Sequence, residues 1–139
     1  MESIQVKDYM KVRPVTFTPD MSVAVAVELL IKSNQSGGPV LGPDKKVIGF
    51  LSEQDCISKM LASTYYRENI ASVGEFMITD VKSVRPYASV IELAQAMAKN
   101  RPRVYPVIDD DGVLLGLISR HDIMVAIDHH LHDAYHTVA

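Results

Sequence analysis

The sequence lacks tryptophan, has a single cysteine and contains no long apolar run. Because Cys56 has no second cysteine to pair with, an internal disulfide is excluded, and one unpaired thiol fits a reducing compartment. No stretch reaches the roughly 20 apolar residues that span a bilayer, and the N-terminus has no apolar segment of signal-peptide length. These absences predict a cytoplasmic location and no membrane partner.

An excess of positive charge is also missing. The formal net charge is −3 and the isoelectric point is about 5.9, whereas proteins that bind nucleic acids by neutralising phosphates are usually basic. With 47% hydrophobic and 22% charged residues, the composition is that of an ordinary globular chain, long enough to form a core. The sequence therefore predicts no nucleic-acid partner.

The motifs of common catalytic sites are absent as well. There is no Gly-x-Gly-x-x-Gly or Walker-type loop and no Gly-x-Ser-x-Gly nucleophile turn. Ser119, His121 and Asp122 do not form a triad, because neighbouring positions of a helix point in different directions. The sequence predicts that the protein is not an enzyme and has no catalytic cofactor.

What the sequence does contain is a repeat. Residues 6–60 align without a gap with residues 73–127, so that Gly49 matches Gly116. Two copies are too few for a solenoid. Copies that cannot bury their apolar faces alone are expected to pair face to face about an approximate two-fold axis, and such pairing creates two similar clefts.

Each copy predicts the order strand, helix, strand, strand, helix, which is an α/β (α+β) fold of two β-α-β-β-α repeats. A short strand at residues 15–17 precedes a helix that begins at Ser22, and apolar residues recur at i, i+3, i+4 and i+7 in both copies. Gly37-Gly38 and Pro102 are expected to end these helices. A strand pair then leads to a last helix in each copy, from about residue 53 to 66 and from about 120 past 128. The expected boundaries are 6–66 for the first copy, 73–130 for the second and 131–139 for a C-terminal extension.

The most specific feature is a serine followed three residues later by an aspartate, after a glycine-containing strand in each copy. These pairs are Ser52 with Asp55 and Ser119 with Asp122. The same spacing is a helix-capping signature that needs no ligand. A helix N-terminus can nevertheless bind a phosphate, and a carboxylate in the first turn of the helix can accept hydrogen bonds from the two hydroxyls of a ribose. Gly49 and Gly116 are expected to leave room for the close approach of another group.

With these motifs the chain resembles a tandem pair of CBS domains, the Bateman module, from about residue 6 to 128. The resemblance implies two clefts that bind adenosine-containing ligands such as AMP, ADP, ATP, NAD or S-adenosylmethionine. It implies that serine and the helix N-terminus hold phosphate and that aspartate holds the ribose. The adenine would lie near residues 12–16 or 79–83, which adds Thr16 and Ser83 to the candidate ligand-binding residues.

The two motifs differ in charge. The second carries Arg120 and His121, and Arg103 stands before its strand, so that this site has groups that can face phosphate. The matching positions of the first copy are Glu53, Gln54 and Ser36. We therefore expect the site of Asp122 to be the tighter phosphate site.

The last helices carry more apolar residues than one small core needs, and these predict a homodimer, which is also the usual assembly of the family that the chain resembles. They are Met60, Leu61 and Tyr65 in the first copy and Ile127, Leu131 and Tyr135 in the second. A protein partner that covers the same residues is the competing interpretation.

Three functional hypotheses follow. The first is a regulatory sensor of an adenosine-containing ligand, and the second is an assembly module whose clefts stay empty. The third is a metal-responsive protein, because histidines and an aspartate share one face of the C-terminal helix with helical spacing. The residues of this metal candidate are His129, His132, Asp133 and His136.

Overall fold

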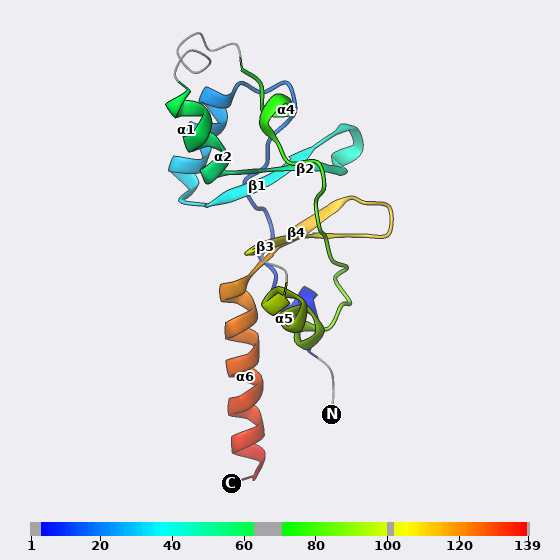
Figure 1. The fold of residues 1–139 in the computed structure, drawn as a ribbon. Coiled ribbons are helices and arrows are strands. Elements are labelled where there is room, and N and C mark those ends of the chain that lie inside the picture. Colours follow the sequence, from blue (N-terminus) through cyan, green and yellow to red (C-terminus); the bar gives the residue numbers. More distant parts are fainter. Residues whose placement is uncertain (1–3, 63–70, 100–101, 139) are drawn as a thin grey trace. The chain divides into compact units, whose positions relative to one another are not determined.

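The computed structural model describes residues 4–62, 71–99 and 102–138, with side chains as far as Asp133 (Figure 1). The chain divides into two compact units. Unit 1 consists of Met1–Arg13 with Lys82–Ala139, and unit 2 of Pro14–Val81. The mixed α/β fold expected from the sequence is confirmed.

The elements of unit 2 are α1 (Val23–Ser33), β1 (Gly37–Leu41), the short η2 (Pro43–Lys45), β2 (Val47–Ser52), α2 (Glu53–Leu61) and α4 (Val73–Phe76). Strands β1 and β2 form an antiparallel hairpin. Single bridges add a neighbour on each side, Phe17 beside Val40 and Ile78 beside Phe50. The first predicted strand is therefore reduced to a single bridge at Phe17.

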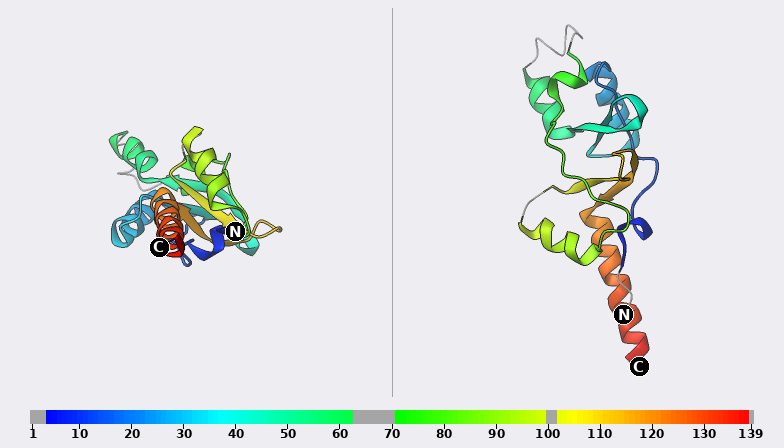
Figure 2. Two further views of the ribbon diagram at one scale, coloured as in Figure 1. Left: turned by 90° about the horizontal axis from the view of Figure 1, so that it is seen from below. Right: turned by 90° about the vertical axis from the view of Figure 1, so that its right-hand side faces the viewer.

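Unit 1 repeats this topology with β3 (Val104–Ile108) and β4 (Leu114–Ser119) as the hairpin, α5 (Val90–Lys99), α6 (Arg120–Val138) and a short N-terminal turn, η1 (Val6–Asp8). Val84 pairs with Val107 on one side of the hairpin, and Lys11 pairs with Leu117 on the other. Lys11 donates to the Leu117 carbonyl over 2.8 Å and accepts from its amide over 2.9 Å. In unit 1, α6 extends beyond α5 (Figure 2).

The two units do not coincide with the two repeats. The segment that begins the first repeat packs with the second repeat, where Val6 is fully buried together with Val90 and Ile118. In the same way Ala71 and Val73, which precede or begin the second repeat, belong to the core of unit 2. In each compact unit, a segment outside the unit's own repeat therefore pairs with the hairpin and contributes residues to the core.

The helix starts follow the sequence signals. Ser22 caps α1, and its hydroxyl accepts from the Val25 amide over 3.2 Å. Ser89 accepts from the Glu92 amide over 3.3 Å at the start of α5. The apolar positions predicted for these helices face the cores: Val23, Ala26, Val27 and Leu30 in α1, and Val90, Leu93 and Met97 in α5 are buried.

The helix ends differ in part from the prediction. The expectation that Gly37-Gly38 end the first helix is wrong, because α1 ends at Ser33 and the two glycines are buried in β1. Asn34 adopts a left-handed conformation with φ of 55°, and its amide bonds to the last carbonyls of the helix. The predicted end of the α2 region at residue 66, and Tyr65, lie outside the described residues, as do residues 100–101 before Pro102.

Candidate functional site

The Ser-x-x-Asp pair of unit 1 forms a closed cap at the start of α6. The Asp122 amide donates to Ser119 Oγ over 3.2 Å, while the amide and the hydroxyl of Ser119 both donate to Asp122 Oδ2 over 2.9 Å. Asp122 is only 7% exposed. Both bonds that the carboxylate accepts go to one oxygen, so within the described residues Oδ1 has no hydrogen-bond partner.

The equivalent pair of unit 2 forms a looser cap. Ser52 Oγ donates to Asp55 Oδ2 over 2.8 Å and accepts from the Asp55 amide over 3.1 Å. In unit 1 the Ser119 amide also donates to the Asp122 carboxylate. Among the described residues of unit 2, no such bond joins the Ser52 amide to Asp55. Asp55 is half-buried. The carboxylate of unit 1 is therefore more firmly oriented than that of unit 2.

The helix N-termini offer fewer free donors than the sequence suggests. The first helical amide of α2, that of Glu53, donates to the Ser36 carbonyl over 2.8 Å, and that of Arg120 donates to the Arg103 carbonyl over 2.9 Å. The serine hydroxyls accept hydrogen bonds from the third helical amides, those of Asp55 and Asp122. Among the described residues at these two helix starts, only the second amides, those of Gln54 and His121, have no partner. Binding of a phosphate would therefore depend more on the charge of nearby side chains.

Gly49 and Gly116 do leave room for another group, but that group is a neighbouring segment of the chain. A side-chain carbon on Gly116 would lie 2.5 Å from the Lys11 carbonyl oxygen, and one on Gly49 would lie 2.5 Å from Met77 Sδ. The space beside each glycine is filled by the segment that forms the outer sheet neighbour of its own unit. These glycines allow close chain approach rather than ligand entry.

The amide–carbonyl bonds at the helix starts bring together residues that are far apart in sequence. In unit 1 they place the backbone of Arg103 beside that of Arg120, with His121 next along the helix, and all three side chains are exposed. In unit 2 they place exposed Ser36 beside exposed Glu53. The difference in charge predicted from the sequence therefore lies at equivalent places of the two units.

The candidates Thr16 and Ser83 occupy equivalent segments as well. Each is half-buried and directly precedes a residue that pairs with a hairpin strand. The Phe17 amide donates to the Pro39 carbonyl over 3.1 Å, and the Val84 amide donates to the Pro106 carbonyl over 3.0 Å. No hydrogen bond among the described residues joins Thr16 to Ser52 or Ser83 to Ser119.

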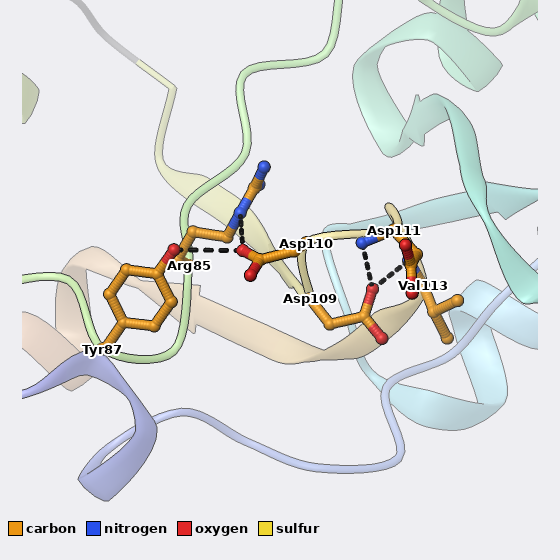
Figure 3. Close-up of polar contacts among 6 residues, drawn as sticks. All are labelled: Arg85, Tyr87, Asp109, Asp110, Asp111 and Val113. Carbon is orange, nitrogen blue, oxygen red and sulfur yellow. Dashed lines mark hydrogen bonds and ion pairs between the residues drawn. The ribbon is translucent and has the colours of Figure 1, made fainter.

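The structure adds a polar cluster that the sequence did not indicate (Figure 3). Arg85 Nε and Tyr87 Oη both contact Asp110 Oδ1, at 3.1 and 3.0 Å. Asp109 Oδ1 accepts from the amides of Asp111 and Val113, both over 2.9 Å. The cluster joins the turn between β3 and β4 to the segment that follows Ser83. The pairing has no sequence signal because its partners are 25 and 23 positions apart.

Unit 2 contains a cavity of about 540 Å³ between α1 and α2. Its polar end is formed by Asn34, Gln35, Ser36 and Glu53. The remaining walls are apolar or contain sulfur: Val27, Leu30, Ile31, Cys56, Ile57 and Met60. Burial, and then the charge of Asp55, raise the pKa of the Cys56 thiol to about 11, so the thiol stays neutral and is a poor nucleophile.

Two histidines of α6 make hydrogen-bond contacts, one with a residue distant in sequence and one within the helix. Tyr9 Oη lies 3.0 Å from His129 Nδ1, and His132 Nδ1 lies 2.9 Å from the Asp128 carbonyl oxygen. Within the described residues no group of three or more potential ligands is arranged to hold a metal ion. The side chain of His136 lies outside the described residues. No helix that the structure describes has the length and apolar character needed to cross a membrane.

Known proteins share this fold. The CBS-pair protein CBSX2 from Arabidopsis thaliana is 26% identical to this chain and superposes with a TM-score of 0.80, over 92% of this chain and 96% of CBSX2. The structure of CBSX2 in complex with AMP is also similar, with a TM-score of 0.79. A putative acetoin utilization protein (AcuB) from Vibrio cholerae is 27% identical, with a TM-score of 0.82 over 98% of both chains.

Sequence comparison gives the same family. An uncharacterized protein, MJ1426, from Methanocaldococcus jannaschii is 24% identical over 91% of this chain and 92% of its own length. Several other curated relatives are longer enzymes, and this chain spans 21–25% of the length of four of them. The model of the CBS domain matches residues 6–62 and again residues 73–129. Both repeats are thus CBS domains, and the chain belongs to the CBS domain family.

Proposed function

We propose that the protein is a non-catalytic regulatory module that binds an adenosine-containing ligand, AMP or a related nucleotide, at its Ser-x-x-Asp sites. The observation that carries this proposal is the oriented carboxylate of Asp122, whose Oδ2 is held by Ser119 and whose Oδ1 has no partner among the described residues. Two hydroxyls of a ribose are suitable donors to such a group. The likeness to CBSX2, which was solved with AMP, supports the same ligand class.

A panel of ligands tests this function by thermal shift. AMP, ADP, ATP, NAD and S-adenosylmethionine are added to the purified protein, with GMP as the control for base selectivity. A ligand present at about one hundred times its dissociation constant stabilises the folded protein by about 2.7 kcal/mol, so at least one adenosine ligand should raise Tm clearly above the GMP value. Because tryptophan is absent, retained nucleotide also shows as excess absorbance near 260 nm. No shift with any adenosine ligand would contradict the proposal and favour the assembly hypothesis.

The proposed sites bind without turnover. The serine hydroxyls donate to aspartate carboxylates, which are weak bases, and covalent catalysis by serine needs a stronger oriented base such as histidine. The buried neutral Cys56 does not supply one.

We also propose that the protein forms a homodimer through α1 and α2. Large apolar side chains are exposed along these helices: Ile31 is 74%, Ile57 is 54% and Leu61 is 81% exposed. Ile31 and Ile57 also line the cavity, and a second copy of the chain offers a matching apolar surface. In unit 1, Met124 and Leu131 of α6 are exposed as well.

Charge placed in this surface should separate the subunits. We expect Ile57→Lys to sediment as a monomer at a micromolar concentration where the wild-type protein is a dimer, because the ammonium would be buried without a partner. Ile48→Lys, at an exposed apolar residue of β2 that does not line the cavity, is the matched control and should remain a dimer. A wild-type monomer at high micromolar concentration, with and without ligand, would argue against the dimer.

A further inference from the structure

A methionine occupies the same place in both compact units. Met10 follows the turn η1 in unit 1, Met77 follows α4 in unit 2, and the two positions correspond in the alignment of the repeats. The Met10 amide donates to the Val6 carbonyl and the Met77 amide donates to the Val73 carbonyl, both over 2.9 Å. Both valines are fully buried. The backbone of each methionine is therefore held by a core residue of its own unit.

The sulfur atom of each methionine lies against a glycine of the neighbouring strand. A side-chain carbon on Gly49 would lie 2.5 Å from Met77 Sδ, and one on Gly116 would lie 3.2 Å from Met10 Sδ. Both methionines pack against the core of their own unit and are half-buried. The thioether therefore fills space that a side chain on the glycine would need, while the residue still reaches solvent.

The residue after each methionine attaches the outer segment of the unit to its hairpin. Lys11 exchanges two hydrogen bonds with Leu117, of 2.8 and 2.9 Å, and Ile78 exchanges two bonds of 2.9 Å with Phe50. Each pair is an isolated bridge rather than part of a longer ladder. Because the methionine contact stands one residue before the bridge, its loss is expected to let the bridge open.

We propose that Met10 and Met77 are oxidation sites through which a peroxide loosens the outer segment of each unit. The sulfur lone pair attacks one peroxide oxygen, the O–O bond breaks and an S–O bond forms. The sulfur loses two electrons, and hydrogen peroxide is reduced to water. The product, methionine sulfoxide, is polar and chiral, and methionine sulfoxide reductases return it to the thioether. The modification is therefore reversible.

A sulfoxide does not suit the place that the thioether occupies. Its oxygen is a hydrogen-bond acceptor, and burying such a group without a donor costs free energy. On the side that faces Gly49 or Gly116, the sulfur has little room for another atom, and packed interiors tolerate added volume poorly. The oxidised side chain is therefore expected to turn toward water, which removes the contact over the glycine and weakens the bridge beside it.

Amide hydrogen exchange on the oxidised protein tests this proposal. The purified protein is treated with hydrogen peroxide, and peptide mass mapping locates the sulfoxides. We expect sulfoxide at Met10 and Met77, and exchange that is about tenfold faster or more at the four amides of the two bridges, equivalent to about 1.4 kcal/mol in the free energy of local opening. Methionine sulfoxide reductases A and B with a thiol should restore the original rates, whereas the thiol alone should not.

Single variants assign each effect to one sulfur. Leucine has a similar volume to methionine but no sulfur to oxidise. After peroxide treatment, Met10→Leu should keep slow exchange at the Lys11 bridge while the Ile78 bridge still exchanges faster, and Met77→Leu should show the converse. Met124→Leu, at a methionine of α6 that is 59% exposed, is the matched control and should respond as the wild-type protein does.

Three results would overturn the proposal. Oxidation of Met124 that leaves Met10 and Met77 as thioethers would show that a peroxide does not reach the two sulfurs. Sulfoxide at both positions without faster exchange would show that the thioether contacts do not hold the bridges. Faster exchange that persists when both methionines are replaced by leucine would assign the effect to another methionine or to the free thiol of Cys56.

Discussion

Replacing Asp122 by alanine is expected to weaken AMP binding about tenfold or more. A hydrogen bond to a charged group is worth about 1.5–3 kcal/mol, and the substitution removes the acceptor proposed for the ribose hydroxyls. Ser119 keeps its hydroxyl, and Arg103, Arg120 and His121 remain in place. The loss in affinity would therefore report the carboxylate alone.

The same substitution also removes a helix cap. The Ser119 amide and hydroxyl lose their acceptor, and loss of a cap costs on the order of 1 kcal/mol. Urea denaturation should show this loss while the protein remains folded at the temperature of the binding assay. Calorimetry with AMP then measures binding on a folded protein.

Two matched variants control the measurement. Asp55→Ala makes the equivalent change in unit 2 and should cost less AMP affinity, because the phosphate-binding residues lie in unit 1. Asp111→Ala removes an exposed turn carboxylate of unit 1 and should leave binding unchanged. If Asp55→Ala abolishes AMP binding and Asp122→Ala does not, the proposed asymmetry of the sites is wrong. If neither changes it, the nucleotide proposal fails.

Replacing Val6 by alanine is expected to destabilise the protein by about 2–3 kcal/mol. Val6 is 0% exposed and belongs to the core of unit 1, although it lies near the beginning of the chain. Each buried methylene contributes about 0.8 kcal/mol, and the cavity left behind adds to the loss. Guanidinium denaturation followed by circular dichroism measures the change in unfolding free energy.

Val12→Ala is the matched control, because Val12 is 64% exposed. Substitutions at exposed positions usually change stability by less than about 0.5 kcal/mol. If Val6→Ala is as mild as Val12→Ala, residues 4–11 do not belong to a folded core and the division into units is wrong. A large loss would show that this N-terminal segment is part of unit 1.

The helix starts and the buried helix faces were predictable from the sequence because their causes are local. A serine accepts an amide three residues ahead, as Ser22, Ser52 and Ser119 do, and apolar spacing near 3.6 residues specifies a buried stripe. The hairpin turn at Gly112 is local too, with a φ of 89° that favours glycine. The repeat of these signals was enough to indicate the family.

The tertiary structure decided what depends on residues distant in sequence. Gly116 faces Lys11 and Tyr9 meets His129 across 120 positions, so no local pattern could show that the space beside the glycine is already filled. The amide bonds from Glu53 to Ser36 and from Arg120 to Arg103 likewise depend on how each hairpin folds back. The sequence by itself determined the elements, the repeat and the signs of charge. Only packing between distant segments determined which of those charges share a helix start, because such contacts depend on how segments far apart in the chain come together.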